Sequence, residues 1–545
     1  MSTYKNFKDP IYGYIEIDNH IISTIIDTPE FQRLRNIIQT SYSPLYSSAV
    51  HNRFVHSLGV YHLGKFLSLS IQKKLSDSLF GTTTKKDIER YFELFEIACL
   101  LHDVGHAPFS HTGEDFYLKD GDRKELHKEI IKLTNDQNMK KEISEKAANY
   151  KAAAHELMSV IVGLKVYSGL FRSDEEKSFF SRCITGYLYA KETDEKHSFL
   201  NCLISFLNSS VIDVDKLDYL IRDAYITGFD TINIDYERLL TSINIKKIDE
   251  KYEVIFMKGA ISVIENVVYA HDAERKWIQN HPIVQYEGFL LRNIIGALNK
   301  KYRGKHLFSY TALTREGIGL SKNYCASLLC DADIIFLMKN LKNNADVKEL
   351  FDRNSRRHPI WKSESEYKAL FDTCFNDKTY DVLDAEMDDF FKYLNYLNSA
   401  QSINEETLKA CEADILSYEE ALCTDKADDS FEDQIVRKRR FKEWIMVFKD
   451  FAKHQGIAFD FVILKQDQFN SGFAKAKFSE LNIKFPELEN ICRFGDVTNV
   501  LTAKKSLRDK FFYVFYRRNE IDKKELDVFE LIDGLNSLAK QRTMR

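Results

Sequence analysis

Segments with apolar residues at helical spacing recur along the first half of the chain, and they constrain its fold most strongly. The 545 residues include only 7 Pro and 21 Gly. Because both residue types interrupt helices and mark turns, their scarcity favours long helices over a turn-rich all-β design. We therefore expect a mainly α protein, with helical segments at Ile22–Ile38, His56–Leu75, Ile88–Leu101, His155–Val166 and Phe199–Asp223. Within the first of these, Asp27–Glu30 reads as a helix start, with Pro29 in the first turn.

The character of the sequence changes near residue 300, where basic clusters begin to alternate with acidic stretches. Alternating or β-branched and aromatic runs predict strands at Ile11–Ile17, Phe459–Lys465 and Lys510–Tyr516. The polar stretch from Asp115 to Lys151 predicts a surface insertion or lid. We expect one compact domain over residues 1–300 and an α+β extension over residues 301–545.

Composition narrows the class of protein and its compartment. Hydrophobic residues make up 44% of the chain and charged residues 29%, which is typical of a soluble globular protein. The net charge of −5 excludes a uniformly basic nucleic-acid-binding surface. Nine scattered cysteines, no signal-peptide pattern at the N-terminus and no apolar run of ~20 residues predict a reduced, cytoplasmic protein without a membrane span.

Histidine and aspartate gather in three short segments, His51–Gly59, Leu101–His111 and Asp213–Asp223. A lone His at a helix end is more often structural than a ligand, but 5 of the 15 histidines fall in the first two segments. The pair His102–Asp103 follows an apolar run, and burying such a pair is costly unless it is hydrogen-bonded or metal-bound. Two imidazoles with two carboxylates suit a divalent ion such as Mn, Fe, Co, Ni or Zn.

The third segment has the apolar spacing of a helix. Asp215, Tyr219, Arg222 and Asp223 are separated by intervals of three and four, so they lie on or near one face. An ion-paired, solvated helix surface is the alternative interpretation. Beside the other two segments, the pattern favours a functional face.

Together these segments resemble the HD superfamily, and more closely its deoxynucleoside triphosphate triphosphohydrolases. The matching motifs stand in the family's order and cover most of residues 7–230: Phe31–Gln39, His51–Gly59, His102–His111, His155–Glu156 and Ile212–Asp223. The resemblance implies a helical-bundle core and metal-dependent hydrolysis of deoxynucleoside triphosphates to deoxynucleoside and triphosphate.

The resemblance also implies a role for each matching position. The metal ligands are His56, His102, Asp103 and Asp215. The catalytic group comprises His106, His111, Glu114 and His155, and Glu114 stands where relatives more often have Asp. The substrate contacts are Gln39, Arg53, Lys216, Tyr219 and Asp223. The cofactor is a divalent ion (Mn, Fe, Mg, Co, Ni or Zn), the expected partners are a deoxynucleotide substrate and an activator nucleotide, and the extension is expected to serve homo-oligomerisation or regulation.

Two regions leave alternatives open. The segment Tyr269–Pro282 departs from the family's phosphate-contacting run, and its candidate replacements are His271, Arg275, Lys276 and His281. The basic run Arg437–Lys442 is compatible with binding nucleic acid or nucleotide phosphates, or with an ordinary solvated helix face. The competing functions are an HD phosphodiesterase or nuclease acting on single strands or cyclic nucleotides, and a non-catalytic nucleotide sensor.

Overall fold

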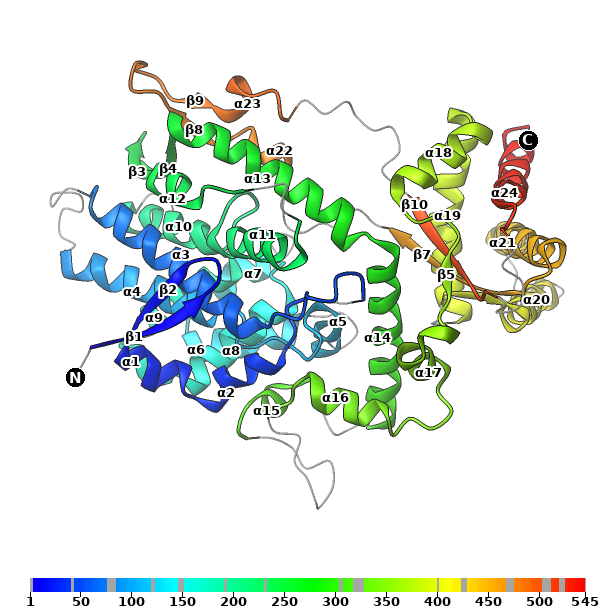
Figure 1. The fold of residues 1–545 in the computed structure, drawn as a ribbon, viewed down its shortest axis with the longest axis horizontal. Coiled ribbons are helices and arrows are strands. Elements are labelled where there is room, and N and C mark those ends of the chain that lie inside the picture. Colours follow the sequence, from blue (N-terminus) through cyan, green and yellow to red (C-terminus); the bar gives the residue numbers. More distant parts are fainter. Residues whose placement is uncertain are drawn as a thin grey trace. The chain divides into compact units, whose positions relative to one another are not determined.

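A computed structural model provides the structure of the chain (Figure 1). It describes residues 3–40, 44–75, 85–118, 123–145, 151–190, 194–229, 233–302, 307–316, 328–398, 401–422, 429–466, 475–501, 511–518 and 525–544. The chain forms two compact units, and each is discontinuous along the sequence. Unit 1 comprises residues 1–275, 294–342 and 470–504, and unit 2 comprises residues 276–293, 343–469 and 505–545.

Unit 1 is built mainly from helices around one hydrophobic core. Its longer helices are α3 (Arg53–Gln72), α4 (Lys85–Leu101), α6 (Lys124–Thr134), α7 (Gln137–Glu145), α8 (Ala154–Val166), α9 (Asp174–Thr185), α10 (Glu195–Leu207), α11 (Val214–Thr227) and α13 (Ile261–Glu274). Shorter helices are α1 (Asn19–Ile21), α2 (Pro29–Gln32), α5 (His111–Glu114), α12 (Tyr236–Thr241), α15 (Tyr310–Leu313), α16 (Asp331–Met338), α22 (Lys475–Phe478) and α23 (Phe494–Val497). Side-chain caps fix the starts of two site-bearing helices, because Asn52 accepts from the Val55 amide before α3 and Asp213 accepts from the Lys216 amide before α11.

Two small sheets complete unit 1. The antiparallel hairpin of β1 (Tyr4–Asp9) and β2 (Gly13–Asp18) pairs Tyr4 with Asp18 at its open end. The second sheet has the order β3-β4-β8-β9, with bounds Ile243–Ile248, Lys251–Met257, Asn482–Lys484 and Cys492–Arg493. Strands β4 and β8 pair in parallel, from Ile255 with Asn482 to Met257 with Lys484. This pairing brings a segment more than 200 residues further along the chain into unit 1.

Unit 2 combines helices with one four-stranded sheet. The helices are α14 (Pro282–Lys301, whose second half belongs to unit 1), α17 (Ala345–Phe351), α18 (Glu364–Cys374), α19 (Asp377–Leu397), α20 (Glu405–Leu422), α21 (Asp429–Gln455) and α24 (Val528–Thr543). The sheet order is β5-β10-β7-β6, with bounds His358–Pro359, Phe511–Tyr516, Asp460–Gln466 and Ser402–Asn404. Aromatic residues dominate its core, where Trp361 and Trp444 are fully buried. In the described residues, no helix is long and apolar enough to cross a membrane.

The expected fold class, mainly α with an α+β C-terminal part, is confirmed. The strands predicted near Phe459 and Tyr516 are β7 and β10, which pair antiparallel over six residues; Lys510 lies outside the described residues. A functional domain boundary at residue 300 remains a prediction. The polar stretch predicted as an insertion or lid contains α6 and α7, and both helices contribute a buried apolar residue, Ile130 and Met139, to the core of unit 1.

Two helix predictions are wrong in detail. The segment Ile22–Ile38 is not one helix but a π-helix (Ile22–Ile26), α2 and a 3₁₀ helix (Arg33–Asn36). The break precedes Pro29, where Thr28 is extended (φ −79°, ψ 148°) because a residue before proline avoids the helical region. Pro29 does start α2, as expected. The segment Phe199–Asp223 forms two helices, α10 and α11, since the chain leaves the helix at Asn208 and Asp213 caps a new one.

Replacing Glu96 with Gln is expected to make unit 1 more stable above pH 7 and to change little at pH 4. Glu96 lies on α4, where burial raises the pKa of its carboxyl group to about 7, although Lys65 opposes the shift. A raised carboxyl pKa means that the fold favours the neutral acid, so wild-type stability falls as pH rises from about 4.5 through 7. We expect a gain on the order of 1–3 kcal/mol in urea unfolding at pH 8. An equal effect at both pH values would contradict this.

Candidate functional site

The four predicted metal ligands converge in unit 1. His56 comes from α3, His102 and Asp103 follow α4, and Asp215 lies in the first turn of α11. The two Nε2 atoms of His56 and His102 lie 3.2 Å apart, and the Asp215 carboxylate lies 3.0 Å from the first and 3.6 Å from the second. Asp103 faces the same imidazoles at 3.6 and 3.5 Å. His56, His102 and Asp103 form a buried group that could hold a metal ion, and Asp215 closes it.

The ring orientation of both histidines suits metal ligation. His56 Nδ1 lies 2.8 Å from an Asp218 carboxylate oxygen, and His102 Nδ1 lies 2.8 Å from the Cys99 carbonyl. If each Nδ1 carries the proton and donates to these oxygens, each Nε2 presents a lone pair to the centre of the group. A second-shell carboxylate or carbonyl commonly orients metal-binding histidines in this way.

The charge of the group also fits a cation. Burial by itself would lower the pKa of His56, but the carboxylates of Asp215 and Asp218 raise it to about 9. Three aspartates in all, Asp103, Asp215 and Asp218, contact the two imidazoles. Their negative charge attracts either protons on the imidazoles or a divalent ion. Imidazole and carboxylate donors match Mn, Fe, Co, Ni or Zn and do not select among them.

Arg53 lies beside this group. Its Nη1 donates to Asp103 Oδ2 at 2.7 Å, and both side chains are buried. Its Nε donates to Ser110 Oγ at 2.9 Å, and its Nη2 to the Gln39 carbonyl at 3.2 Å. Arg53, the predicted phosphate contact, is thus positioned next to the metal ligands by its ion pair with one of them, Asp103.

A second cluster of imidazoles adjoins the first, and it contains all four residues predicted to be catalytic. The His106 ring stacks on His155 with centroids 4.1 Å apart and meets His111 edge-on at 5.2 Å. Glu114 joins the outer two rings, because its carboxylate is 2.9 Å from His111 Nδ1 and also contacts His155 Nδ1. His106 Nε2 is 3.4 Å from Asp103 Oδ1, so the two clusters are contiguous.

The electrostatics of these rings differ. Burial lowers the pKa of His106 well below its usual value, and neighbouring Arg53 and His155 add to the effect. Burial also acts to lower the pKa of His155, but the Glu114 carboxylate outweighs it and raises that pKa to about 9. Burial and nearby charges thus shift the pKa values of these two stacked imidazoles in opposite directions. The third ring, that of His111, belongs to a side chain that is 57% exposed.

The predicted substrate contacts on α11 are arranged less uniformly. Tyr219 is half-buried one turn after Asp215, and Asp223 binds His51 Nε2 at 2.8 Å. Lys216 Nζ donates to Asp213 at 2.6 Å and to the Ser209 carbonyl at 2.9 Å, so its charge is already paired.

Gln39 and Arg222 have different surroundings. Gln39 is buried, and its backbone N–H donates to the His51 carbonyl, which places it beside this region. Its side-chain Oε1 has no hydrogen-bond partner among the described residues. Arg222 does not share the face of Asp215: it pairs with Asp218 and Asp9 on the side of the β1–β2 hairpin.

The two regions that left alternatives open make contacts of their own. In the segment that departs from the family pattern, His271 lies 3.7 Å from Asp272 and Lys276 lies over the Trp277 ring at 5.0 Å. Roles for His271, Arg275, Lys276 and His281 in phosphate binding remain predictions.

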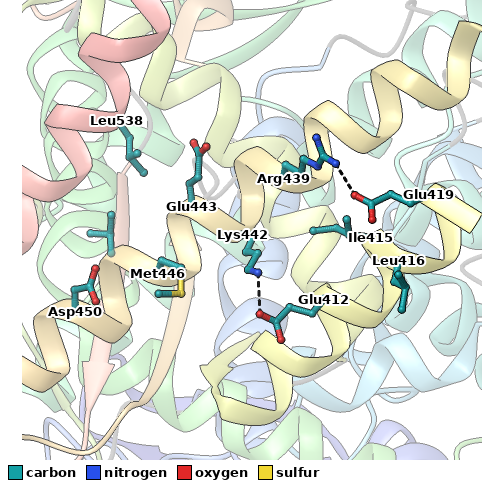
Figure 2. A pocket seen from close by; sticks show the side chains of 11 residues that line it. Glu412, Ile415, Leu416, Glu419, Arg439, Lys442, Glu443, Met446, Asp450 and Leu538 are labelled. Atoms are coloured by element: carbon teal, nitrogen blue, oxygen red, sulfur yellow. Dashed lines mark hydrogen bonds and ion pairs between the residues drawn. The ribbon is translucent and has the colours of Figure 1, made fainter.

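In unit 2, every basic side chain of the run Arg437–Lys442 pairs with a carboxylate: Arg437 with Asp389, Lys438 with Asp414, Arg439 with Glu419, Arg440 with Glu386 and Lys442 with Glu412. Two of these pairs line a groove of about 770 Å³ between α20, α21 and α24 (Figure 2). Glu443 and Asp450 also line it, giving the groove more carboxylates than cations. This arrangement favours the helix-surface interpretation over an anion-binding one.

Several residues that shape the site were not predicted from the sequence. Asp218 orients His56, and His51 binds Asp223. Both stand inside motifs that were recognised, so their presence could have signalled a supporting role. Arg33 and Asp331 also contact the loop that carries His106, and Asp331 lies too far along the chain for any motif to indicate it.

Comparisons with known proteins agree with this geometry. Residues 53–177 match the family model "HD domain". An uncharacterised protein of Mycoplasma genitalium is 31% identical over 48% of this chain and 52% of its own length. The deoxynucleoside triphosphate triphosphohydrolase SAMHD1 homolog of Dictyostelium discoideum is 30% identical over 53% of this chain and 48% of its own, and human SAMHD1 is 29% identical over 56% and 47%. The chain thus spans about half the length of these curated relatives.

A solved structure of a hypothetical protein from Aquifex aeolicus covers 98% of this chain and 99% of its own, with a TM-score of 0.49 and 16% identity. Because both values are low, neither a shared fold nor a shared function follows from that likeness. The matched segment 53–177 holds three of the four convergent ligands and all four residues of the second cluster. Residues 53–177 therefore match the HD domain model, and over about half its length the chain is similar to proteins named deoxynucleoside triphosphate triphosphohydrolases.

Proposed function

We propose that the chain is a metal-dependent phosphohydrolase that cleaves deoxynucleoside triphosphates into deoxynucleoside and triphosphate. The observation that carries the proposal is the convergence of His56, His102, Asp103 and Asp215 directly beside the imidazole cluster around His106. A metal ion can activate the phosphoryl group and a water molecule, and neighbouring imidazoles can transfer protons, so together they can support hydrolysis of a phosphate ester. The names of the relatives support the substrate class.

Each part of the site has a distinct task in this proposal. The four ligands would hold a divalent ion, which when bound polarises a phosphoryl oxygen and lowers the pKa of a coordinated water. Arg53 places a positive charge beside Asp103, where it offsets the negative charge of a triphosphate. His155, with its pKa raised to about 9, holds a proton that can be donated to a leaving oxygen.

The half-exposed His111 lies at the outer end of the cluster and is fixed by Glu114. It can therefore meet a substrate without rearrangement of the buried rings. Gln39, Tyr219 and Asp223 are proposed to contact the sugar. Gln39 Oε1, which has no hydrogen-bond partner within the described part of the chain, offers an acceptor to a ligand hydroxyl. Lys216 is proposed to contact phosphate, which requires it to exchange part of its pairing with Asp213.

A panel of the four deoxynucleoside triphosphates, incubated with the full chain and Mn²⁺ or Mg²⁺, tests the proposal. We expect deoxynucleoside and triphosphate as products, and no turnover after chelation. The panel is repeated with added nucleotides, because an activator is part of the expectation from the relatives. Release of a nucleoside monophosphate with pyrophosphate, or no turnover under any condition, would contradict the proposed reaction. Metal-dependent cleavage of an oligonucleotide or a cyclic nucleotide would instead favour the phosphodiesterase alternative.

A further inference from the structure

A segment from beyond residue 300 reaches the loops of the metal centre. Asp331, the first residue of α16, accepts two backbone hydrogen bonds: its Oδ2 from the Ile38 amide at 2.8 Å and its Oδ1 from the Phe109 amide at 2.7 Å. Ile38 immediately precedes Gln39, and Phe109 immediately precedes Ser110. One carboxylate therefore joins two segments that are about 70 residues apart in sequence and that both border the site.

Arg33 makes a second link between the same parts of unit 1. Its guanidinium group is buried and donates to three main-chain carbonyls. One belongs to Leu329, at 2.9 Å, and the others belong to Val104 and His106, at 3.2 and 2.7 Å. The residues just before α16 are thus tied to the loop that follows His102 and Asp103. Because the buried Arg33 guanidinium donates to carbonyl groups here, we infer that these hydrogen bonds stabilise the conformation of this loop.

The path of that loop is unusual. Phe109 and Ser110 have φ values of 59° and 52°, in the left-handed region that residues other than glycine seldom adopt. Such a conformation persists only where the surroundings enforce it. The hydrogen bond from Phe109 to Asp331 and the bond from Ser110 Oγ to the Ile38 carbonyl supply that enforcement.

Ser110 connects this strained turn to a metal ligand. Its Oγ accepts from Arg53 Nε at 2.9 Å, and Arg53 Nη1 donates to Asp103 Oδ2 at 2.7 Å. A continuous chain of short contacts therefore runs from Asp331 through the turn to Arg53 and Asp103. Three members of this chain carry ionisable side chains: Arg53 and Asp103, which are buried, and Asp331, which is partly buried.

We propose that Asp331 is a positioning residue of the metal centre, which fixes the turn at Phe109–Ser110 and through it the orientation of Arg53 and Asp103. The inference rests on the proposed metal site and is independent of the substrate. It assigns to α16, outside the segment that matches the HD domain, the task of completing the supports of that site. A change in the position of α16 would alter the metal centre without touching a ligand.

The test compares Asp331→Asn with Asp333→Asn by titrating the full chain with Co²⁺ and following its visible absorption. Asp333 lies two residues further on the same helix and is exposed, and its Oδ2 accepts from the Cys330 amide at 2.9 Å. The side-chain oxygen of Asn can still accept that one bond, so Asp333→Asn removes one carboxylate charge and keeps the cap. An amide at position 331 keeps the shape but presents NH₂ to one of the two backbone amides. We expect about tenfold weaker Co²⁺ binding and altered absorption bands for Asp331→Asn, the size typical of second-shell changes. We expect Asp333→Asn to behave as the wild type does.

The side-chain oxygen of Asn at position 331 can still accept from one of the two amides, so the variant is expected to fold; circular dichroism checks this. Should Asp331→Asn be unfolded, Asp331→Glu replaces it, because it keeps the charge but displaces the carboxylate. Unchanged Co²⁺ affinity and bands in a folded variant would overturn the inference. A wild-type chain that binds Co²⁺ but hydrolyses no deoxynucleoside triphosphate would overturn the proposed function and leave this inference standing. A wild-type chain that binds no Co²⁺ would overturn both.

Discussion

Asp215→Ala is expected to abolish metal binding and hydrolysis while leaving the chain folded. Asp215 is the one ligand whose side chain is 35% exposed, and it lies 3.0 Å from His56 Nε2. Removing the Asp215 carboxylate leaves no buried cation without its ion-pair partner. Removing the Asp103 carboxylate, in contrast, would leave the buried Arg53 without its ion pair. Changes in second-shell partners cost about 10- to 100-fold in metal affinity, so loss of a direct ligand should exceed ~100-fold. Metal content by mass spectrometry and the nucleotide panel measure the two effects.

Two further variants calibrate that result. Asp218→Asn keeps every ligand but weakens the acceptor that orients His56, so its loss of affinity should be intermediate, at about 10- to 100-fold. Glu89→Gln removes an exposed carboxylate from α4 and should bind metal as the wild type does. Full metal occupancy in Asp215→Ala would show that Asp215 is not a ligand and would require another fourth donor.

Gly105→Ala is expected to destabilise unit 1 by about 2–4 kcal/mol, because the added methyl group overpacks the contact between α8 and the loop that follows His102 and Asp103. A Cβ at this position would lie 2.3 Å from the Ser159 amide nitrogen and 2.4 Å from the Met158 carbonyl carbon. Both are backbone atoms of a buried helix, so no side chain can move aside. The Gly105 amide also donates to Ser159 Oγ at 2.9 Å, a bond that any displacement would stretch. Chemical denaturation followed by circular dichroism measures the loss.

Gly169→Ala is the matched control. A Cβ there meets no atom within 4 Å, so the substitution should be neutral or slightly stabilising. We also expect Gly105→Ala to lower metal-dependent activity, since moving α8 away shifts His155 relative to His106. Equal stability of the two glycine variants would mean that the loop relaxes freely, which the close backbone packing argues against.

Much of the candidate site could be predicted because its residues occur in short local motifs. His102 and Asp103 are adjacent after an apolar helix, and His111 and Glu114 are three residues apart, so local spacing already brings them together. Their assembly with His56 and Asp215 was expected from the order of the motifs, and the side-chain distances agree with it. The expected common face of α11 was only partly right, because Arg222 turns toward Asp218 and Asp9 instead.

Other features depend on contacts that no local pattern encodes. The helix predicted over Ile22–Ile38 breaks because the backbone before Pro29 is extended. The resulting turns place Arg33 against the loop that follows His102 and Asp103. Charge pairing of the basic run Arg437–Lys442 depends on acidic residues from other helices of unit 2. Neither outcome follows from hydrophobic periodicity, which reports only which face of a segment is buried.

The sequence by itself determined that the chain is mainly helical, because helical periodicity is a local property, and its motifs, by their resemblance to the HD family, indicated which histidines and aspartates to expect in the candidate site. Only the tertiary structure decided how those residues are oriented. The Asp218 carboxylate and the Cys99 carbonyl direct the two imidazoles, and Asp331 fixes the turn beside Asp103 from about 220 residues away in sequence. Orientation depends on hydrogen bonds between segments that are distant along the chain, and these form only when the packed core brings the segments together.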